Sequence, residues 1–175
     1  MPQVFLIADT HFGHKGIIDY ENRPFADVAD MDRRLVENWN RTVEAEDSVL
    51  MLGDFSMAAD ARIRELLEAL RGRKTLIMGN HDRSRPPAWW QEAGFELACP
   101  YPIVYDDMLL LSHEPLYVNA NMPYVNLFGH VHGNPAYKDV SGQHLCVSCE
   151  RIDYTPILLE RAKEMIIEAR ARVGA

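Results

Sequence analysis

The chain has 175 residues, of which 47% are hydrophobic and 25% charged, a composition typical of a globular domain rather than a disordered segment. Because 18 Lys and Arg stand against 26 Asp and Glu, the formal charge is −8 at pH 7 and the surface repels a polyanion on average. We therefore expect a single domain over residues 1–175 that does not bind long nucleic acid.

Cysteines and apolar segments indicate the compartment. Cys99, Cys146 and Cys149 are too few and too unevenly spaced for a disulfide framework, which favours a reducing compartment. Because residues three apart on an extended run point to opposite faces, Cys146 and Cys149 are expected to be small buried side chains rather than a metal or redox pair.

Residues 1–7 lack a basic n-region, and no apolar stretch approaches the length of a membrane span. We expect a cytoplasmic protein without membrane contact.

The first half of the chain alternates strand and helix patterns. Near-continuous apolar runs, typical of strands covered on both faces, span residues 4–8, 48–52 and 74–78. Helical patterns span residues 27–43 and 59–70 between them. The resulting βαβαβ order predicts a parallel sheet, and ligands of such sheets gather outside the carboxyl ends of the strands.

The second half contains short strands with brief connections. Apolar runs span residues 95–99, 108–112, 125–128 and 144–148, and a helical pattern closes the chain at residues 159–173. These runs predict a second sheet, largely antiparallel or mixed.

Polar motifs follow these runs at the predicted strand ends, and six of the seven histidines lie in them. In Asp9-Thr10-His11 the two outer side chains are separated by one residue, so they project to the same side of a strand end and can bind one ion. His130-Val131-His132 repeats this spacing. Gly53 and Gly129 precede candidate ligands, and the lack of a Cβ lets the backbone approach a crowded site.

The order of the motifs DxH, GD, GNHD, SHEP and GHVH resembles that of the calcineurin-like metallophosphoesterase superfamily, from Asp9 to His132. The strings DTHFGH, NRPF, MDRRLVENWN and LGDF resemble a branch of small single-domain bacterial and phage members. The resemblance implies an α/β fold, a four-layer α/β/β/α sandwich of two mixed sheets flanked by helices. It places a dinuclear metal centre between the strand ends of the two sheets.

The resemblance also implies the ligands of the two divalent metal ions. One ion would be held by Asp9, His11, Asp54 and His132, and the other by Asp54, Asn80, His113 and His130. Asp54 would bridge the ions, because each of its two oxygens can bind one of them. Nitrogen and oxygen ligands without thiolate fit Mn²⁺, Fe, Zn²⁺ or Ni²⁺, and Mn²⁺ is the first expectation because the family commonly works with it.

The chemistry implied is hydrolysis of a phosphate ester, either a phosphodiester or a small phosphomonoester or nucleotide. A hydroxide bridging two metal ions would attack phosphorus in line with the leaving oxygen. His81 is implied as the general acid that protonates the leaving group. Asp82 would orient His81 through a hydrogen bond, and a turn-forming Asx residue is an equally good interpretation.

Further residues are candidates for substrate contact. His14 follows the first motif closely enough to line the pocket, and Arg23 offers a fork for a phosphate oxygen. Helix-face or salt-bridge roles fit both residues as well. Trp39, Trp89 and Trp90 offer surfaces for stacking a base, with packing as their default role.

Two other functions fit the same motifs. One is a scaffold or binding protein that keeps the fold without turnover, and the other is a nuclease that acts on DNA ends. Every expected ligand position carries a usable residue, which disfavours the scaffold, and the charge of −8 disfavours long polymers. The expected partner is a small phosphate ester, and the sequence leaves the oligomeric state open.

Overall fold

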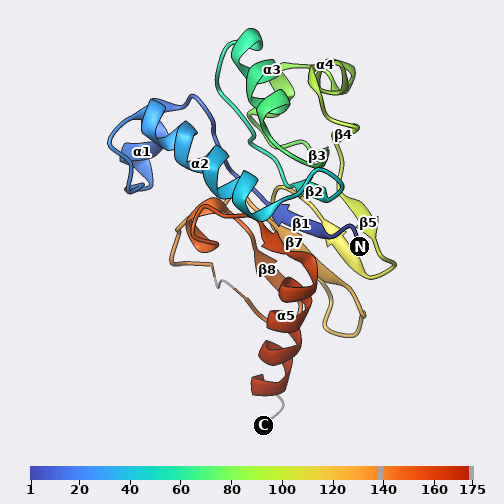
Figure 1. The fold of residues 1–175 in the computed structure, drawn as a ribbon. Coiled ribbons are helices and arrows are strands. Elements are labelled where there is room, and N and C mark those ends of the chain that lie inside the picture. Colours follow the sequence, from blue (N-terminus) through green and yellow to red (C-terminus); the bar gives the residue numbers. More distant parts are fainter. Residues whose placement is uncertain (138–139, 174–175) are drawn as a thin grey trace.

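Two mixed sheets flanked by helices make up the protein in a computed structural model that describes residues 1–137 and 140–173 (Figure 1). The first sheet has the strand order β4-β3-β2-β1-β9. Its strands are β1 (Val4–Ile7), β2 (Ser48–Met51), β3 (Arg73–Ile77), β4 (Leu97–Cys99) and β9 (Ile157–Leu158). Strands β1 to β4 are parallel, and β9 runs antiparallel to β1. The four parallel strands therefore end at the same edge of the sheet.

The second sheet has the order β5-β6-β7-β8. Its strands are β5 (Ile103–Tyr105), β6 (Leu109–Leu111), β7 (Val125–Phe128) and β8 (His144–Cys146). Only the β5–β6 pair is antiparallel, so the mixed alternative is confirmed. Assigning residues 95–99 to this sheet was wrong, because they form β4, which pairs in parallel with β3 of the first sheet.

Five α-helices complete the described fold: α1 (Lys15–Tyr20), α2 (Val28–Thr42), α3 (Asp60–Ala69), α4 (Pro87–Ala93) and α5 (Leu159–Val173). Short 3₁₀ turns, η1 (Asp82–Ser84) and η2 (Cys149–Arg151), follow β3 and β8. Helix α2 begins after Asp27, whose side chain accepts a hydrogen bond from the amide of Asp30. The three longer helices match the predicted ranges, whereas the short α1 and α4 were not predicted.

Helices α2, α3 and α4 pack on one face of the first sheet. Their buried side chains include Leu35, Trp39, Leu66 and Trp90, which join alternate residues of the strands in one apolar core. The indole nitrogens of Trp39 and Trp90 donate to the backbone carbonyls of Arg71 and Asp82. Both tryptophans therefore have the packing role and not the base-stacking one, since each is at most 1% exposed.

A second core lies between the two sheets. The opposite faces of β1 and β2 meet Leu111, Leu127 and Leu145 there, and α5 contributes Leu159 and Ile166. The predicted α/β class is thus confirmed, with apolar contact holding the strand ends of both sheets together.

The cysteines are free thiols in the described structure, and Cys146 and Cys149 are buried in different apolar clusters. Burial raises the pKa of both thiols. The expectation that they are small buried side chains is confirmed. No helix among residues 1–137 and 140–173 is long and apolar enough to cross a membrane.

We predict that Trp39→Ala lowers the free energy of unfolding by about 3–5 kcal/mol, because it leaves a large cavity in the first core and removes a satisfied indole donor. Trp89→Ala is the control, since Trp89 is only partly buried and its ring lies under the guanidinium of Arg85. Urea unfolding followed by circular dichroism gives both values. Equal losses in the two variants would contradict this account of the core.

Candidate metal centre

The carboxyl ends of the strands in the two sheets are joined by hydrogen bonds. The amide of Ala8 donates to the carbonyl of Val147 at 2.9 Å, and the amide of Asp9 donates to the carbonyl of Gly53 at 3.0 Å. The amide of His130 donates to Asp9 Oδ2 at 2.9 Å. Motifs far apart in the sequence therefore meet at this seam.

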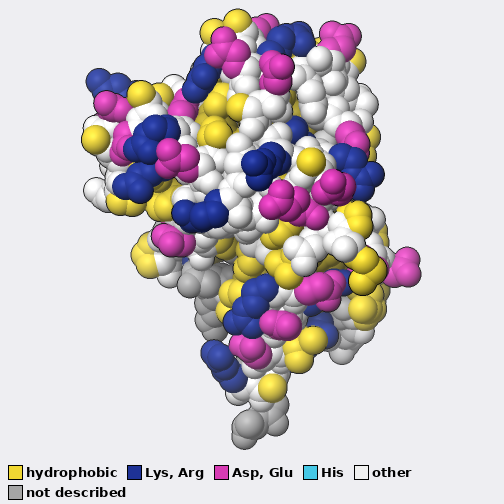
Figure 2. Space-filling model, viewed as in Figure 1, with side chains coloured by type: hydrophobic (Ala, Val, Ile, Leu, Met, Phe, Trp, Pro, Cys, Tyr) yellow, Lys and Arg dark blue, Asp and Glu magenta, His cyan; other side chains and the backbone are white. Residues whose placement is uncertain are grey.

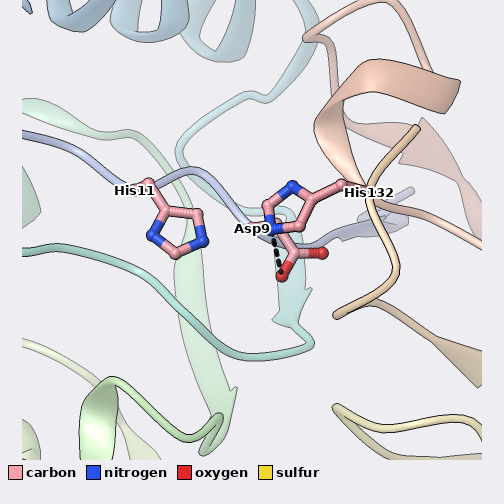
Figure 3. A group of neighbouring side chains, drawn as sticks. All are labelled: Asp9, His11 and His132. Atoms are coloured by element: carbon pink, nitrogen blue, oxygen red, sulfur yellow. Dashed lines mark ion pairs between the residues drawn. The ribbon is translucent and has the colours of Figure 1, made fainter. Parts of the chain in front are cut away.

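Two groups of potential ligands form at the seam. Asp9, His11 and His132 present donor atoms that all lie within 4.8 Å of one another, and Figure 3 shows these side chains converging from the end of β1 and from the loop after β7. A second group with the same spacing consists of Asp54, His113 and His130.

Asp54 lies between the two groups. Its Oδ2 is 3.5 Å from His11 Nε2 in the first group and 3.4 Å from His113 Nε2 in the second. A carboxylate in this position can bridge two cations. The structure thus brings the expected bridging residue to the expected place.

Asn80 completes the second group. Its Oδ1 lies 3.0 Å from His113 Nε2, and His130 Nδ1 lies 3.1 Å from the same atom. Because His113 Nδ1 faces the carbonyl of Leu52 at 2.9 Å, that nitrogen must carry a proton. A cation bound at Nε2 would require neutral His113, and Asn80 Oδ1 and His130 Nδ1 lie beside that atom as further potential ligands.

The pKa shifts reflect the same crowding. Burial raises the pKa of Asp9 to about 6 and lowers that of His11 to about 2. Burial alone would lower the pKa of His113, but the hydrogen bond to Asp54 and the charges of Asp9 and Asp54 raise it to about 9. Burial would likewise raise the pKa of Asp54, but its contacts with His113 outweigh this and lower it to about 2.

Orphaned polar atoms test whether these residues fit a metal. Among the described residues, Asp9 Oδ1 and both ring nitrogens of His11 are buried without a hydrogen-bond partner. A buried acceptor without a partner costs about 1–3 kcal/mol, so a native structure rarely leaves several together. Divalent cations bind such carboxylate oxygens and neutral imidazoles, and the residues therefore fit the metal that the motifs imply.

The backbone at the candidate ligands adopts an uncommon conformation. Five of them have φ between 46° and 67°, in the left-handed region: Asp9, His11, Asp54, His130 and His132. Each non-glycine residue held there costs of the order of 1–3 kcal/mol, and Asp and His tolerate it better than most. Such strain gathers at functional sites, where the surrounding structure maintains it.

Two predicted glycines permit the close approach of the strand ends. A Cβ on Gly129 would lie 2.6 Å from Asp9 Oδ2, and one on Gly53, whose φ is +87°, would overlap the ring of His113. Both positions therefore require glycine, as their place before the ligands suggested.

His81 lies at the rim of the centre. Its side chain is 39% exposed, and its Nε2 is 3.9 Å from Asp54 Oδ2. Its ring centroid is 5.3 Å from that of His11, and its amide donates to Asp54 Oδ1 at 3.0 Å. The imidazole thus stands beside the centre and faces solvent, where it can reach a substrate.

Asp82 has a different role from the one expected. Its Oδ2 accepts from the amides of Asp54 and Gly79 at 2.8 Å, and its Oδ1 accepts from that of Phe55 at 3.0 Å. The described structure contains no hydrogen bond from Asp82 to the ring of His81. Because both oxygens are occupied by backbone amides, Asp82 holds the loop that carries Asp54 rather than the imidazole.

Arg23 also departs from the expectation of substrate contact. Its guanidinium is fully buried and donates to the carbonyls of Asp9 at 2.7 Å and Thr10 at 2.9 Å. The remaining contacts of its nitrogens are with Glu150 and the sulfur of Met31. It has no free edge for a phosphate, so it stabilises the backbone of the first ligand loop.

His14 lies beside the histidines of the centre. Its ring centroid is 5.5 Å from that of His11 and 6.4 Å from that of His81. Burial lowers the pKa of His14. The position agrees with a residue that lines the pocket.

Glu150 was missed by the sequence reasoning. Its Oε1 lies 3.1 Å from His132 Nδ1 and 2.7 Å from Arg23 Nη2. A carboxylate accepts, so His132 Nδ1 donates and the lone pair of Nε2 is left to face the first ligand group. Burial would raise the pKa of Glu150, but the contacts with His132 and Arg23 lower it to about 2. Its position two residues after the last apolar run was the available signal.

Known proteins share the family of this chain. A family model described as Calcineurin-like phosphoesterase matches residues 2–148. The chain is 33% identical over 175 residues to Uncharacterized protein MJ1445 of Methanocaldococcus jannaschii, covering 95% of this chain and 92% of that one. Gene 66 protein of Mycobacterium phage D29 is 40% identical over 92 residues, which are 49% of this chain and 43% of the phage protein. Small relatives of this kind fit the small single-domain branch.

A solved structure also shares the fold. The crystal structure of the protein of unknown function AQ665 from Aquifex aeolicus has a TM-score of 0.71 and 24% sequence identity, covering 95% of this chain and all of that one. At this identity the likeness concerns the fold alone.

We predict that Glu150→Gln weakens metal binding about 10- to 100-fold, because the amide carries no charge to hold the His132 tautomer and leaves Arg23 without its counter-ion. Titration calorimetry with Mn²⁺ measures the affinity directly. Glu160→Gln removes the same charge from an exposed position on α5 and serves as the control. Equal affinities in the two variants would show that Glu150 does not position the ligand.

Proposed function

Because this chain belongs to the calcineurin-like phosphoesterase family, we propose that it hydrolyses a phosphate ester at a dinuclear centre. The observation that carries the proposal is the placement of Asp54 between two groups of ligands, Asp9, His11 and His132 on one side and Asn80, His113 and His130 on the other. Two divalent cations there would supply a hydroxide nucleophile and polarise the phosphoryl oxygens.

Four histidines of the chain account for metal binding, proton donation and substrate contact in this proposal. His113 Nδ1 donates to the carbonyl of Leu52, and His132 Nδ1 donates to the carboxylate of Glu150. When either ring is neutral, the lone pair of its Nε2 is therefore directed at the centre. His81 stands at the rim and donates a proton to the leaving oxygen. His14, whose ring lies beside that of His11, would contact a non-reacting part of the substrate.

We propose Mn²⁺ as the native metal, with Fe, Zn²⁺ or Ni²⁺ as the alternatives that the same ligands accept. The set contains imidazole, carboxylate and amide oxygen without thiolate, which suits borderline divalent ions. The free thiols of the described chain fit a reducing compartment, which supports a cytoplasmic location.

We propose that the substrate is a small phosphate ester, with a phosphodiester ahead of a phosphomonoester or nucleotide. Asn80 and His130 are exposed and His81 is partly exposed, so the centre is open enough for groups on both ester oxygens. Basic and acidic side chains alternate on the face shown in Figure 2. The charge of −8 over the whole chain, rather than the pattern on this one face, disfavours a nuclease acting on long polymers.

A scaffold without turnover remains the other candidate in this fold. In such a scaffold no metal would need to be bound, so the potential ligand side chains would have no reason to converge. Here the donors converge, and several of them have a strained backbone conformation. Such strain supports a catalytic centre rather than a scaffold that has lost its activity.

We predict that His81→Ala retains its metal and loses about 10²- to 10⁴-fold in kcat, because the leaving oxygen then departs without a proton donor. Turnover of bis-p-nitrophenyl phosphate and p-nitrophenyl phosphate with Mn²⁺ gives the rates, and bound metal is counted by mass spectrometry. His144→Ala is the control, since His144 binds the carbonyl of Leu116 away from the centre. A wild-type rate for His81→Ala would exclude this histidine as the general acid.

We predict that removing metal with a chelator abolishes turnover and that added Mn²⁺ restores it. Asp54→Asn is expected to stay inactive after the same addition, because one amide oxygen cannot replace a bridging carboxylate. Bound metal per chain should fall in this variant while its circular dichroism spectrum is preserved. Turnover that survives chelation would contradict a metal-dependent reaction.

A further inference from the structure

A small cavity adjoins the metal centre on the side of the second ligand group. It has a volume of about 100 Å³, and its walls include Arg83, Tyr101, Glu114 and His113. His113 is shared, because it is both a wall of the cavity and a member of the ligand group. Whatever occupies the cavity therefore contacts a residue of the second ligand group.

Arg83 is the basic residue among these walls, and its side chain is free. Among residues 1–137 and 140–173, Arg83 forms no hydrogen bond and no ion pair. It does not pair even with Glu114, the acidic residue that lines the same cavity. The neighbouring Arg85 is engaged with Asp60 at 2.7 Å, and Arg23 is fully buried. In a chain with 26 acidic and 18 basic residues, an exposed guanidinium without a carboxylate partner is available to an external anion.

Arg83 is also close in sequence to His81, the proposed general acid. It follows His81 by two residues, which limits the separation of their Cα atoms to about 7 Å. Both residues belong to the turn that follows β3, and both are accessible to solvent. The turn thus carries both the proposed proton donor and a solvent-accessible cation.

The size of the cavity limits what it can hold. Pockets that enclose a whole small molecule begin at roughly 300 Å³. About 100 Å³ suits one compact group rather than a nucleobase. Guanidinium binds phosphate through two parallel charge-assisted hydrogen bonds, so a phosphate is the compact group that Arg83 recognises best.

We propose that Arg83 binds a second phosphate of the substrate, next to the one that is cleaved. The inference rests on the proposed function, and it narrows the substrate class to phosphate esters that carry a further phosphate group, such as a phosphorylated nucleotide ester. Glu114 lines the same cavity and would repel a phosphate there, so Arg83 is the residue that must supply the attraction. Arg83 thereby takes the phosphate-binding place for which Arg23 is too deeply buried.

Two esters that differ by one phosphate test the proposal. They are thymidine 5′-(p-nitrophenyl phosphate) and the same compound with a 3′-phosphate, assayed with Mn²⁺ on the full chain. We expect the wild-type protein to prefer the 3′-phosphorylated ester roughly 10- to 100-fold in kcat/KM, mainly through KM, as hydrogen bonds between charged groups allow. In Arg83→Gln the preference should fall to about one, and Arg83→Lys should restore part of it.

The control is Arg34→Gln, which removes the same charge from the exposed side of α2, where Arg34 pairs with Asp30. A preference lost equally in this variant would indicate a general charge effect and overturn the proposal. So would a wild-type protein without preference, or an Arg83→Gln variant that keeps it.

A binding measurement separates this proposal from the proposed function. Hydrolysis of neither ester would count against the phosphoesterase reaction alone. Calorimetry with thymidine 3′,5′-bisphosphate and thymidine 5′-monophosphate, which need no turnover, then decides the role of Arg83. Weaker binding of the bisphosphate alone in Arg83→Gln would support the second phosphate site, and equal binding in wild type and variant would overturn it.

Discussion

The burial of carboxylates and imidazoles at the seam between two sheets is the constraint on which the structure depends. Asp9 is completely buried, and its Oδ2 accepts from the amide of His130 across the seam, while its Oδ1 has no hydrogen-bond partner among the described residues. Desolvation makes such groups costly unless charge of the opposite sign is present. Bound cations would supply that charge, so metal binding and the joining of the sheets are expected to stabilise each other.

Two buried charged side chains hold the ligand loops in their strained conformations, and they do so in opposite ways. Arg23 donates to the backbone carbonyls of Asp9 and Thr10, whereas Asp82 accepts from the backbone amides around Asp54. A loop in the left-handed region has backbone groups that no helix or sheet satisfies, and a buried unsatisfied group is expensive. These side chains meet that need, which explains why charged residues are buried beside the centre without facing it.

How far the sequence predicts this molecule depends on the range of the interactions. Strand ends and two-residue spacings are local, so the polar motifs from Asp9 to His132 and the three longer helices could be predicted, whereas the division of those motifs into two ligand sets came from the family resemblance. The partners of Arg23 and Glu150 could not, because these residues lie 127 positions apart and meet only through the fold. Residues 95–99 were assigned to the wrong sheet for a similar reason, since a short strand does not encode which edge it will join.

Burial divides the candidate site into a crowded centre and an exposed rim. Asp9, His11, Asp54 and His113 are at most 3% exposed, and a change in any of them disturbs a crowded polar core. Solvent reaches the rim, which includes His81 and Arg83, and a rim side chain can change at little cost in folding. Under the proposed function, the buried side chains would hold the metal ions, and substrate preference is expected to depend on the exposed turn after β3, which carries Arg83.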